Sequence, residues 1–176
     1  EYQYYASDIT RTFPVNGRFS AEQRAVYEVV LEAQDAALAR CRPGNHWNDP
    51  HDAAVQSITR GLVRLGLLKG RVPALIKAGD YRRFFMHRTG HWLGMDVHDV
   101  GDYKVGDEWR VLEPGMCLTV EPGIYIPAGS KGVPRRWWNI GIRIEDDVAI
   151  TTAGCEVLTA GLPRTPDEVE RVMRAA

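Results

Sequence analysis

Apolar residues recur every three or four positions along two long stretches in the first half of the chain, which is the spacing of an amphipathic helix. The first stretch begins with a capping box, because Gln23 follows Ser20 by three residues. The second begins at Asn48-Asp49-Pro50, where proline suits the first helical turn. The pattern predicts helices from Ser20 to about Arg40, from Asn48 to Gly66 or Gly70, over residues 73–78, and from Thr165 onward.

Beyond about residue 84 the apolar runs become short, and glycine and proline separate them, as is typical of strands. Residues 1–15 also have an extended pattern, and the turn signal Asn16-Gly17 would allow them to fold back as a hairpin. The predicted strands are residues 84–86, 116–120, 124–126, 140–144 and 148–150. Helices packed on a largely antiparallel sheet define an α+β fold, in one domain over residues 1–176.

Charge and cysteine content exclude several classes of partner. With 22 Lys and Arg against 23 Asp and Glu, the net charge of −1 lacks the basic excess of a protein that binds nucleic acid or an anionic membrane, so we expect neither partner. The three cysteines are odd in number and widely spaced, which favours reduced thiols over a disulfide frame or a zinc site. Because the sequence also contains no export leader and no long apolar run, we expect a cytoplasmic protein.

Charged residues inside two of the predicted strands indicate a functional site. Alternation puts Glu121 on the face opposite Val120, and it puts Arg143 and Glu145 together on the face opposite the neighbouring isoleucines. An antiparallel pairing of the two strands would bring both carboxylates to one face of the sheet. For either glutamate alone, a solvated strand face is the more common explanation, and Arg143 could simply pair with Glu145 or a neighbour.

Histidines and a lone aspartate strengthen the functional interpretation. A single histidine in an apolar segment is more often a core residue than a ligand, but His87, His91 and His98 fall within twelve residues. Their spacing differs from the HExxH pattern of helical zinc proteases. Asp8 lies in the apolar N-terminal stretch. Carboxylates together with one or more imidazoles suit Mn²⁺, Fe²⁺, Co²⁺ or Zn²⁺, and two such ions can activate a water and polarise a carbonyl.

Four segments of the chain resemble one family of metallopeptidases. The segments are ASDITRTFPVNGRF, GHWLGMDVHDVGDY, LEPGMCLTVEPGIYI and GIRIEDDV, and they extend over nearly the whole chain. They are similar to the catalytic domain of Xaa-Pro aminopeptidases (aminopeptidase P), which have the pita-bread fold. The resemblance implies a curved antiparallel sheet covered by helices. It also implies hydrolysis of the N-terminal Xaa-Pro bond of peptides by a metal-activated hydroxide.

The resemblance assigns a role to each candidate residue. It implies a two-metal site, usually with Mn²⁺, in which Asp8, His91, Glu121 and Glu145 are ligands and Glu121 is also a general base. His87 and His98 match cleft histidines that steady the scissile carbonyl and move protons. Arg143 matches a group that supports a carboxylate ligand. The implied substrates are peptides with proline at the second position.

One motif of the family is not found in this sequence. The family's first metal-ligand aspartate belongs to an Asp-Ala-Gly stretch upstream of residues matching the start of the chain, so we expect a C-terminal fragment without the N-terminal domain and the first catalytic strand. We therefore expect at most one well-held metal ion and weak or absent activity. The alternatives are a prolidase, which cuts only Xaa-Pro dipeptides, and a non-catalytic pita-bread module that binds a partner. Family members are often dimers or tetramers, so a homo-oligomer stays open.

Overall fold

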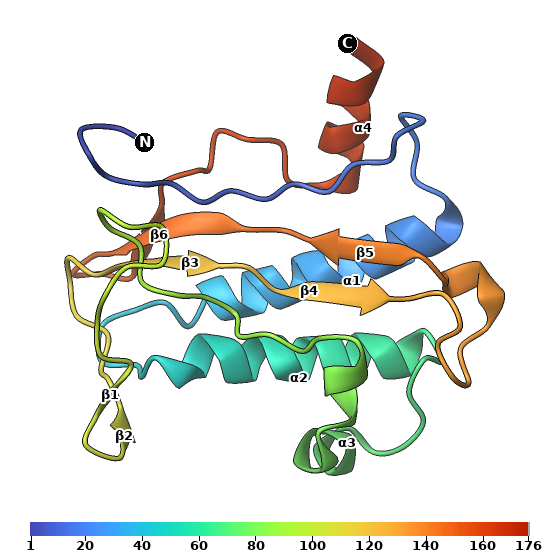
Figure 1. The fold of residues 1–176 in the computed structure, drawn as a ribbon, viewed down its shortest axis with the longest axis horizontal. Coiled ribbons are helices and arrows are strands. Elements are labelled where there is room, and N and C mark those ends of the chain that lie inside the picture. The colour runs from blue at the N-terminus through green and yellow to red at the C-terminus, as the bar shows by residue number, and fades with distance from the viewer. Residues whose placement is uncertain (176) are drawn as a thin grey trace.

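Two long helices lie side by side behind the strands in the computed structural model, which describes residues 1–175 (Figure 1). The helices are α1 (Ala21–Leu38), α2 (Asn48–Arg64), α3 (Val72–Ala78) and α4 (Pro166–Ala175). The strands are β1 (Lys104–Val105), β2 (Glu108–Trp109), β3 (Cys117–Val120), β4 (Gly123–Ile126), β5 (Ile140–Arg143), β6 (Asp146–Ile150) and β7 (Cys155–Val157). Single 3₁₀ turns occupy Asp80–Arg83 and Arg135–Trp137.

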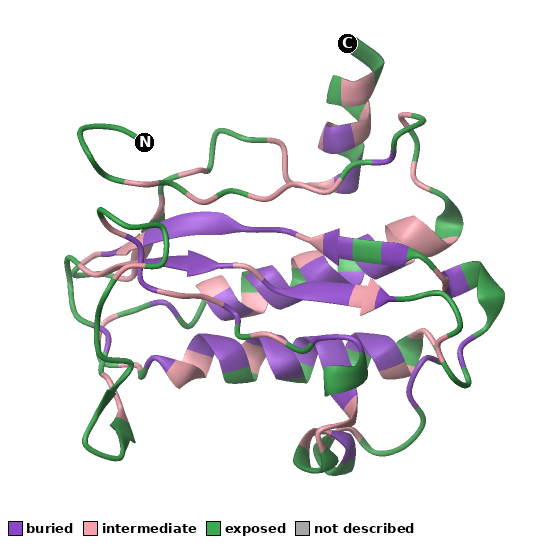
Figure 2. Ribbon diagram, viewed as in Figure 1, coloured by how far each residue is buried: buried purple, intermediate pink, exposed green. Residues whose placement is uncertain are grey.

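The core lies between α1, α2 and the strands, as the buried surfaces of these elements indicate (Figure 2). The capping box at Ser20 and Gln23 is confirmed, with both reciprocal hydrogen bonds present at the start of α1. The two helices approach closely at Gly61 of α2, where an added Cβ would lie 2.2 Å from a methyl group of Val29. This packing makes α1 and α2 a firm support for the strands above them.

The strands pair antiparallel, as the sequence predicted. The β3–β6 ladder and the β4–β5 ladder have the same register, with a break between them. In the first ladder Val120 of β3 lies opposite Asp146 of β6, and in the second Gly123 of β4 lies opposite Arg143 of β5. Glu121 follows Val120 and Glu145 precedes Asp146, so the same register puts Glu121 opposite Glu145. Pro122 follows Glu121 and has no N–H to donate, which interrupts the ladder at this point. The two carboxylates therefore face each other at the break.

Two predicted features of the backbone are wrong. Residues 84–86 are not a strand. The Phe84 carbonyl accepts the Tyr125 N–H of β4 at 2.9 Å, and the segment that follows lies along β3, with an isolated bridge between Trp92 and Leu118. Residues 1–15 form no hairpin beyond a tight Tyr2–Tyr5 bridge; they run extended beside β5 and β6. The short hairpin of β1 and β2 and the strand β7 were not predicted, because strands of two or three residues show no alternation.

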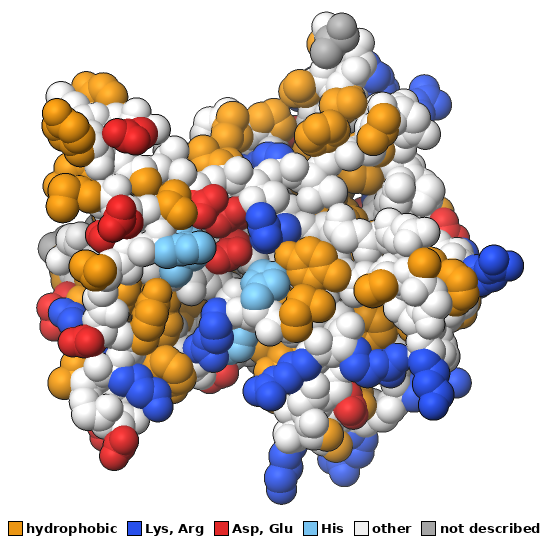
Figure 3. All heavy atoms as spheres, viewed as in Figure 1, with side chains coloured by type: hydrophobic (Ala, Val, Ile, Leu, Met, Phe, Trp, Pro, Cys, Tyr) orange, Lys and Arg blue, Asp and Glu red, His pale blue; other side chains and the backbone are white. Residues whose placement is uncertain are grey.

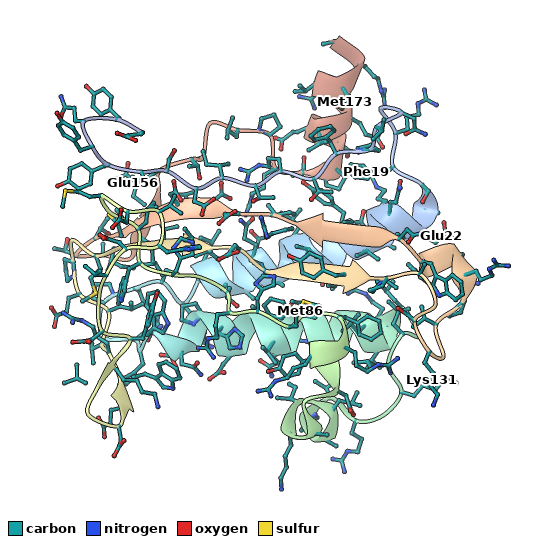
Figure 4. All side chains as sticks on the ribbon, in the orientation of Figure 1. Phe19, Glu22, Met86, Lys131, Glu156 and Met173 are labelled. Carbon is teal, nitrogen blue, oxygen red and sulfur yellow. The ribbon has the colours of Figure 1, made fainter. Side chains whose placement is uncertain are left out.

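The C-terminal helix α4 stands against the beginning of α1. The Thr165 hydroxyl accepts the Glu168 N–H at 3.3 Å and the Glu168 carboxylate accepts the Thr165 N–H at 2.9 Å, which confirms the predicted cap. At this junction the Phe19 N–H donates to Glu170 at 3.0 Å, and Phe19 and Met173, both labelled in Figure 4, pack against the core. Among the helices of residues 1–175, none is long and apolar enough to cross a membrane.

Candidate metal centre

Four segments that are distant in the sequence bring the predicted ligands together. Asp8 comes from the extended N-terminal segment, His91 from the segment before β1, and Glu121 and Glu145 from the break between the two ladders. Donor atoms of His91, Glu121 and Glu145 all lie within 4.8 Å of one another, and so do those of Asp8, His91 and His98. Figure 3 shows histidine and acidic side chains meeting near the middle of one face of the molecule.

The ring of His91 is oriented so that its Nε2 faces the carboxylates and can serve as a metal ligand. Its Nδ1 lies 2.9 Å from the carbonyl oxygen of Trp92, so Nδ1 carries the proton and donates it to that oxygen. The other ring nitrogen, Nε2, lies 3.3 Å from Asp8 Oδ2 and 3.8 Å from Glu121 Oε1. This arrangement, in which a backbone acceptor fixes one nitrogen and leaves the other directed at carboxylates, is typical of metal-binding histidines.

The Glu145 carboxylate is buried and held in place by Thr10 and Arg143. The Thr10 hydroxyl donates to Glu145 Oε2 and accepts from Arg143 Nε at 3.2 Å. The Glu145 N–H in turn donates to the Thr10 carbonyl at 3.0 Å. Arg143 Nε lies 3.8 Å from Glu145 Oε2, which is consistent with the predicted supporting role. The N-terminal segment therefore fixes Glu145 through both its backbone and a side chain.

Burial and crowding of carboxylates disfavour negative charge here. Burial, followed by the nearby Glu145 charge, raises the pKa of Glu121 to about 7. Burial also raises the pKa of Glu145, against the lowering effect of its hydrogen bond from Thr10. Asp147, whose Oδ2 accepts the Asp8 N–H at 3.1 Å, has its pKa raised to about 6 by burial. A cation would stabilise the ionised forms of all these groups.

The two other predicted histidines differ in their surroundings. His87 Nε2 lies 2.9 Å from the hydroxyl of Tyr125 on β4, and burial lowers the pKa of His87, which favours a neutral ring. His98 is exposed, and its ring packs edge-on against His91 with the centroids 4.3 Å apart. His98 therefore adjoins the ligand His91 directly, whereas His87 lies beside Tyr125 and close enough to Arg143 for that charge to lower its pKa.

Sequence reasoning missed three residues that shape the cluster. They are Thr10, Asp147 and Tyr125. The motif DITRTF already contains Thr10 two residues after Asp8, a spacing that puts both on one side of an extended chain. Asp147 similarly follows Glu145 by two residues. No comparable signal identifies Tyr125, because its contact with His87 depends on the register of β4.

The cluster fits a divalent cation. Oxygen atoms from several carboxylates and one imidazole nitrogen match what Mn²⁺, Fe²⁺, Co²⁺ and Zn²⁺ accept. The side chain of Glu145 is 2% exposed, and a buried carboxylate beside other carboxylates calls for a compensating positive charge. The tautomer of His91 is the one that a metal requires.

Comparison with known proteins supports the same conclusion. Residues 1–152 match the model of metallopeptidase family M24. The chain belongs to this family. The chain is 52% identical over 176 residues to the Xaa-Pro aminopeptidase of Escherichia coli. This alignment covers 100% of the chain and 40% of that protein. It is 48% identical over 170 residues to Xaa-Pro aminopeptidase 2 of Streptomyces coelicolor, covering 96% of the chain and 36% of that protein.

Solved structures of M24 relatives confirm the fold. An aminopeptidase from Pseudomonas aeruginosa superposes with a TM-score of 0.96 at 63% identity, over 98% of this chain and 39% of that one. A zinc-substituted aminopeptidase P from Escherichia coli, in complex with product, gives 0.95 at 51% identity, over 99% of this chain and 39% of that one. The fold is therefore the pita-bread α+β fold that the sequence predicted. The chain spans about 40% of the length of the curated relatives first named above.

Proposed function

We propose that this chain forms the metal centre of an Xaa-Pro aminopeptidase, which releases the first residue of peptides that have proline second. The observation that carries the proposal is the convergence of His91, Glu121 and Glu145, whose donor atoms lie within 4.8 Å of one another, with Asp8 3.3 Å from the same imidazole nitrogen. Membership of family M24 and the names of the relatives support a peptidase.

The cation is held by Asp8, His91, Glu121 and Glu145. Mn²⁺ is the preferred ion in this proposal, with Zn²⁺, Co²⁺ and Fe²⁺ as alternatives that the same donors accept. When bound, the cation would polarise the scissile carbonyl and lower the pKa of a water molecule. One well-held ion per chain is expected, because these four groups would hold one ion, and a second ion would share only the carboxylates of Asp8 and Glu145.

The chain's own side chains move protons and hold the substrate. Glu121 is the general base of this proposal, and its carboxylate would accept a proton from the attacking water and return it to the leaving proline nitrogen. His87 donates its Nδ1–H to the Arg88 carbonyl at 2.7 Å, and its Nε2 contacts the Tyr125 hydroxyl at 2.9 Å, so it would donate to a substrate carbonyl only when Nε2 carries a proton and exchanges the Tyr125 contact for that oxygen. His98 is exposed beside His91 and is placed to exchange protons with solvent.

Metal binding and peptide hydrolysis test the proposal on the 176-residue chain. Calorimetric titration with Mn²⁺ is expected to give one site per chain, and Glu121→Gln is expected to weaken it. Cleavage of Ala-Pro-Ala should exceed cleavage of Ala-Ala-Ala, should be abolished by EDTA, and should be weak, because the resemblance implies two ions. A chain that binds no Mn²⁺ would instead support a partner-binding module. Cleavage of Ala-Pro but not of Ala-Pro-Ala would indicate a prolidase.

A further inference from the structure

A buried histidine outside the ligand cluster contacts the segment that carries His87 and His91. His51 lies on the first turns of α2, with 9% of its surface exposed, and its Nδ1 is 2.9 Å from the hydroxyl of Thr89. Thr89 is 3% exposed. In Figure 4 the segment marked by Met86 passes over α2, so the contact joins this segment to the helix layer. None of the roles assigned so far uses His51.

Thr89 connects this contact to the metal centre. Its carbonyl accepts the Glu121 N–H at 2.7 Å, and it lies two residues from both His87 and His91. The His91 carbonyl in turn accepts the Thr119 N–H at 3.0 Å. A displacement of Thr89 would therefore move the backbone of Glu121 and the ring of His91 together.

For residues 87–91, His51 provides a buried hydrogen bond on the helix side, beside the aromatic contact of Trp47 with Trp92 at the end of the segment. Gly90 fits so closely against β3 that an added Cβ would lie 2.0 Å from the Thr119 carbonyl oxygen. On the helix side, Arg88 donates to Asn48, but this contact is exposed. His51 is buried and uncharged, because burial and then the charge of Arg88 lower its pKa to about 4. Its hydrogen bond with Thr89 therefore persists over the whole neutral range.

We propose that His51 is a positioning residue for the metal centre. Its hydrogen bond to the Thr89 hydroxyl fixes the segment from His87 to His91 against β3, and so sets the direction of His91 Nε2 and the place of Glu121. The inference rests on the proposed metal site. Residues that orient metal ligands in this way typically change metal affinity about 10- to 100-fold when they are replaced.

Four variants separate positioning from simple packing. His51→Leu and Thr89→Val each leave one buried polar partner without its hydrogen bond, so both are expected to lower stability and to weaken Mn²⁺ binding about 10- to 100-fold. The double variant replaces both partners with apolar groups, so its stability is expected to recover, while Mn²⁺ binding stays weak. In His51→Asn the amide reaches the position of Nδ1, so near-normal Mn²⁺ binding is expected. His46→Leu, at an exposed histidine before α2, is the matched control and should change neither property.

Two measurements distinguish these outcomes. Calorimetry gives the Mn²⁺ dissociation constant, and hydrogen exchange in EDTA gives the protection of the Glu121 amide, which is expected to fall in His51→Leu and in the double variant. If the double variant binds Mn²⁺ as tightly as the wild type and keeps its amide protection, His51 is only a packing residue and the inference is overturned. If the wild type binds no Mn²⁺, the proposed function fails, and amide protection alone then decides whether His51 positions the segment.

Discussion

Replacing Glu121 with glutamine tests whether crowding of buried carboxylates destabilises the metal-free chain. Burial and the neighbouring Glu145 raise the pKa of Glu121 from 4.5 to about 7. In the unfolded chain the pKa returns to its ordinary value, so the folded chain binds more protons between these two pH values. The free energy of unfolding contributed by Glu121 is therefore fully present below pH 4.5 and is lost as the pH rises through 7.

The magnitude follows from the size of this pKa shift. Each unit corresponds to about 1.4 kcal/mol, so ionising Glu121 costs the folded chain about 2 to 3 kcal/mol between pH 5 and pH 8. Its side chain is 16% exposed, so screening by solvent removes little of this. His51 acts in the opposite direction, because burial lowers its pKa to about 4 and its contribution to stability rises up to its ordinary pKa of 6.5. The comparison must therefore be made between variants at the same pH.

The assay is urea unfolding in EDTA, followed by tryptophan fluorescence, at pH 5 and pH 8. Relative to the wild type, Glu121→Gln is expected to gain about 2 to 3 kcal/mol in unfolding free energy on going from pH 5 to pH 8. Glu156→Gln, at an exposed carboxylate on β7, is the control and should show no such gain. If Glu121→Gln loses stability between pH 5 and pH 8 as steeply as the wild type, the account of crowded carboxylates is refuted.

Three further predictions follow from close contacts and from metal binding. Gly90→Ala would place a Cβ 2.0 Å from the Thr119 carbonyl oxygen, so we expect a loss of several kcal/mol in urea unfolding and loss of Mn²⁺ binding by calorimetry; a normal titration would contradict it. Gly61→Ala crowds Val29 at 2.2 Å and should cost about 1–3 kcal/mol, whereas Gly154→Ala, with open space around it, should change little; equal effects would contradict the packing of α1 and α2. Mn²⁺ at about 100 times its dissociation constant should add about 2.7 kcal/mol to the unfolding free energy at pH 8, raising the melting temperature by about 5–10 °C; an unchanged melting temperature would contradict metal binding.

The parts of the fold with a repeating local signal could be predicted from the sequence. The capping box at Ser20 and the alternation around Glu121 and Glu145 depend on neighbouring residues, so they are readable from the sequence alone. The convergence of the ligand side chains was anticipated because four motifs resemble one family, and their roles stay predictions.

What could not be predicted depends on contacts between distant residues. Residues 84–86 are apolar like a strand, yet they meet β4 through one backbone hydrogen bond, from Tyr125 to the Phe84 carbonyl, and it is the segment after them that lies along β3, where Gly90 leaves no room for a side chain. His51 is a single histidine on a helix, and its partner Thr89 lies 38 residues away, so no pattern connects them. The turn at Gly106-Asp107 is the one signal that could have indicated the hairpin of β1 and β2.

Because the two ladders share one register, the spacing of Glu121 and Glu145 does not depend on the length of the loop between β4 and β5. Residues 127–139 connect β4 to β5, and the ladders on both sides of the break fix Glu121 opposite Glu145 whatever the path of this connection. Changes at the exposed residues of this connection are therefore expected to leave the spacing of the two carboxylates unaltered, whereas Val133 and Trp137 of the same connection belong to the buried core. The strand pairing thus fixes the spacing of the two carboxylates independently of the exposed part of the loop.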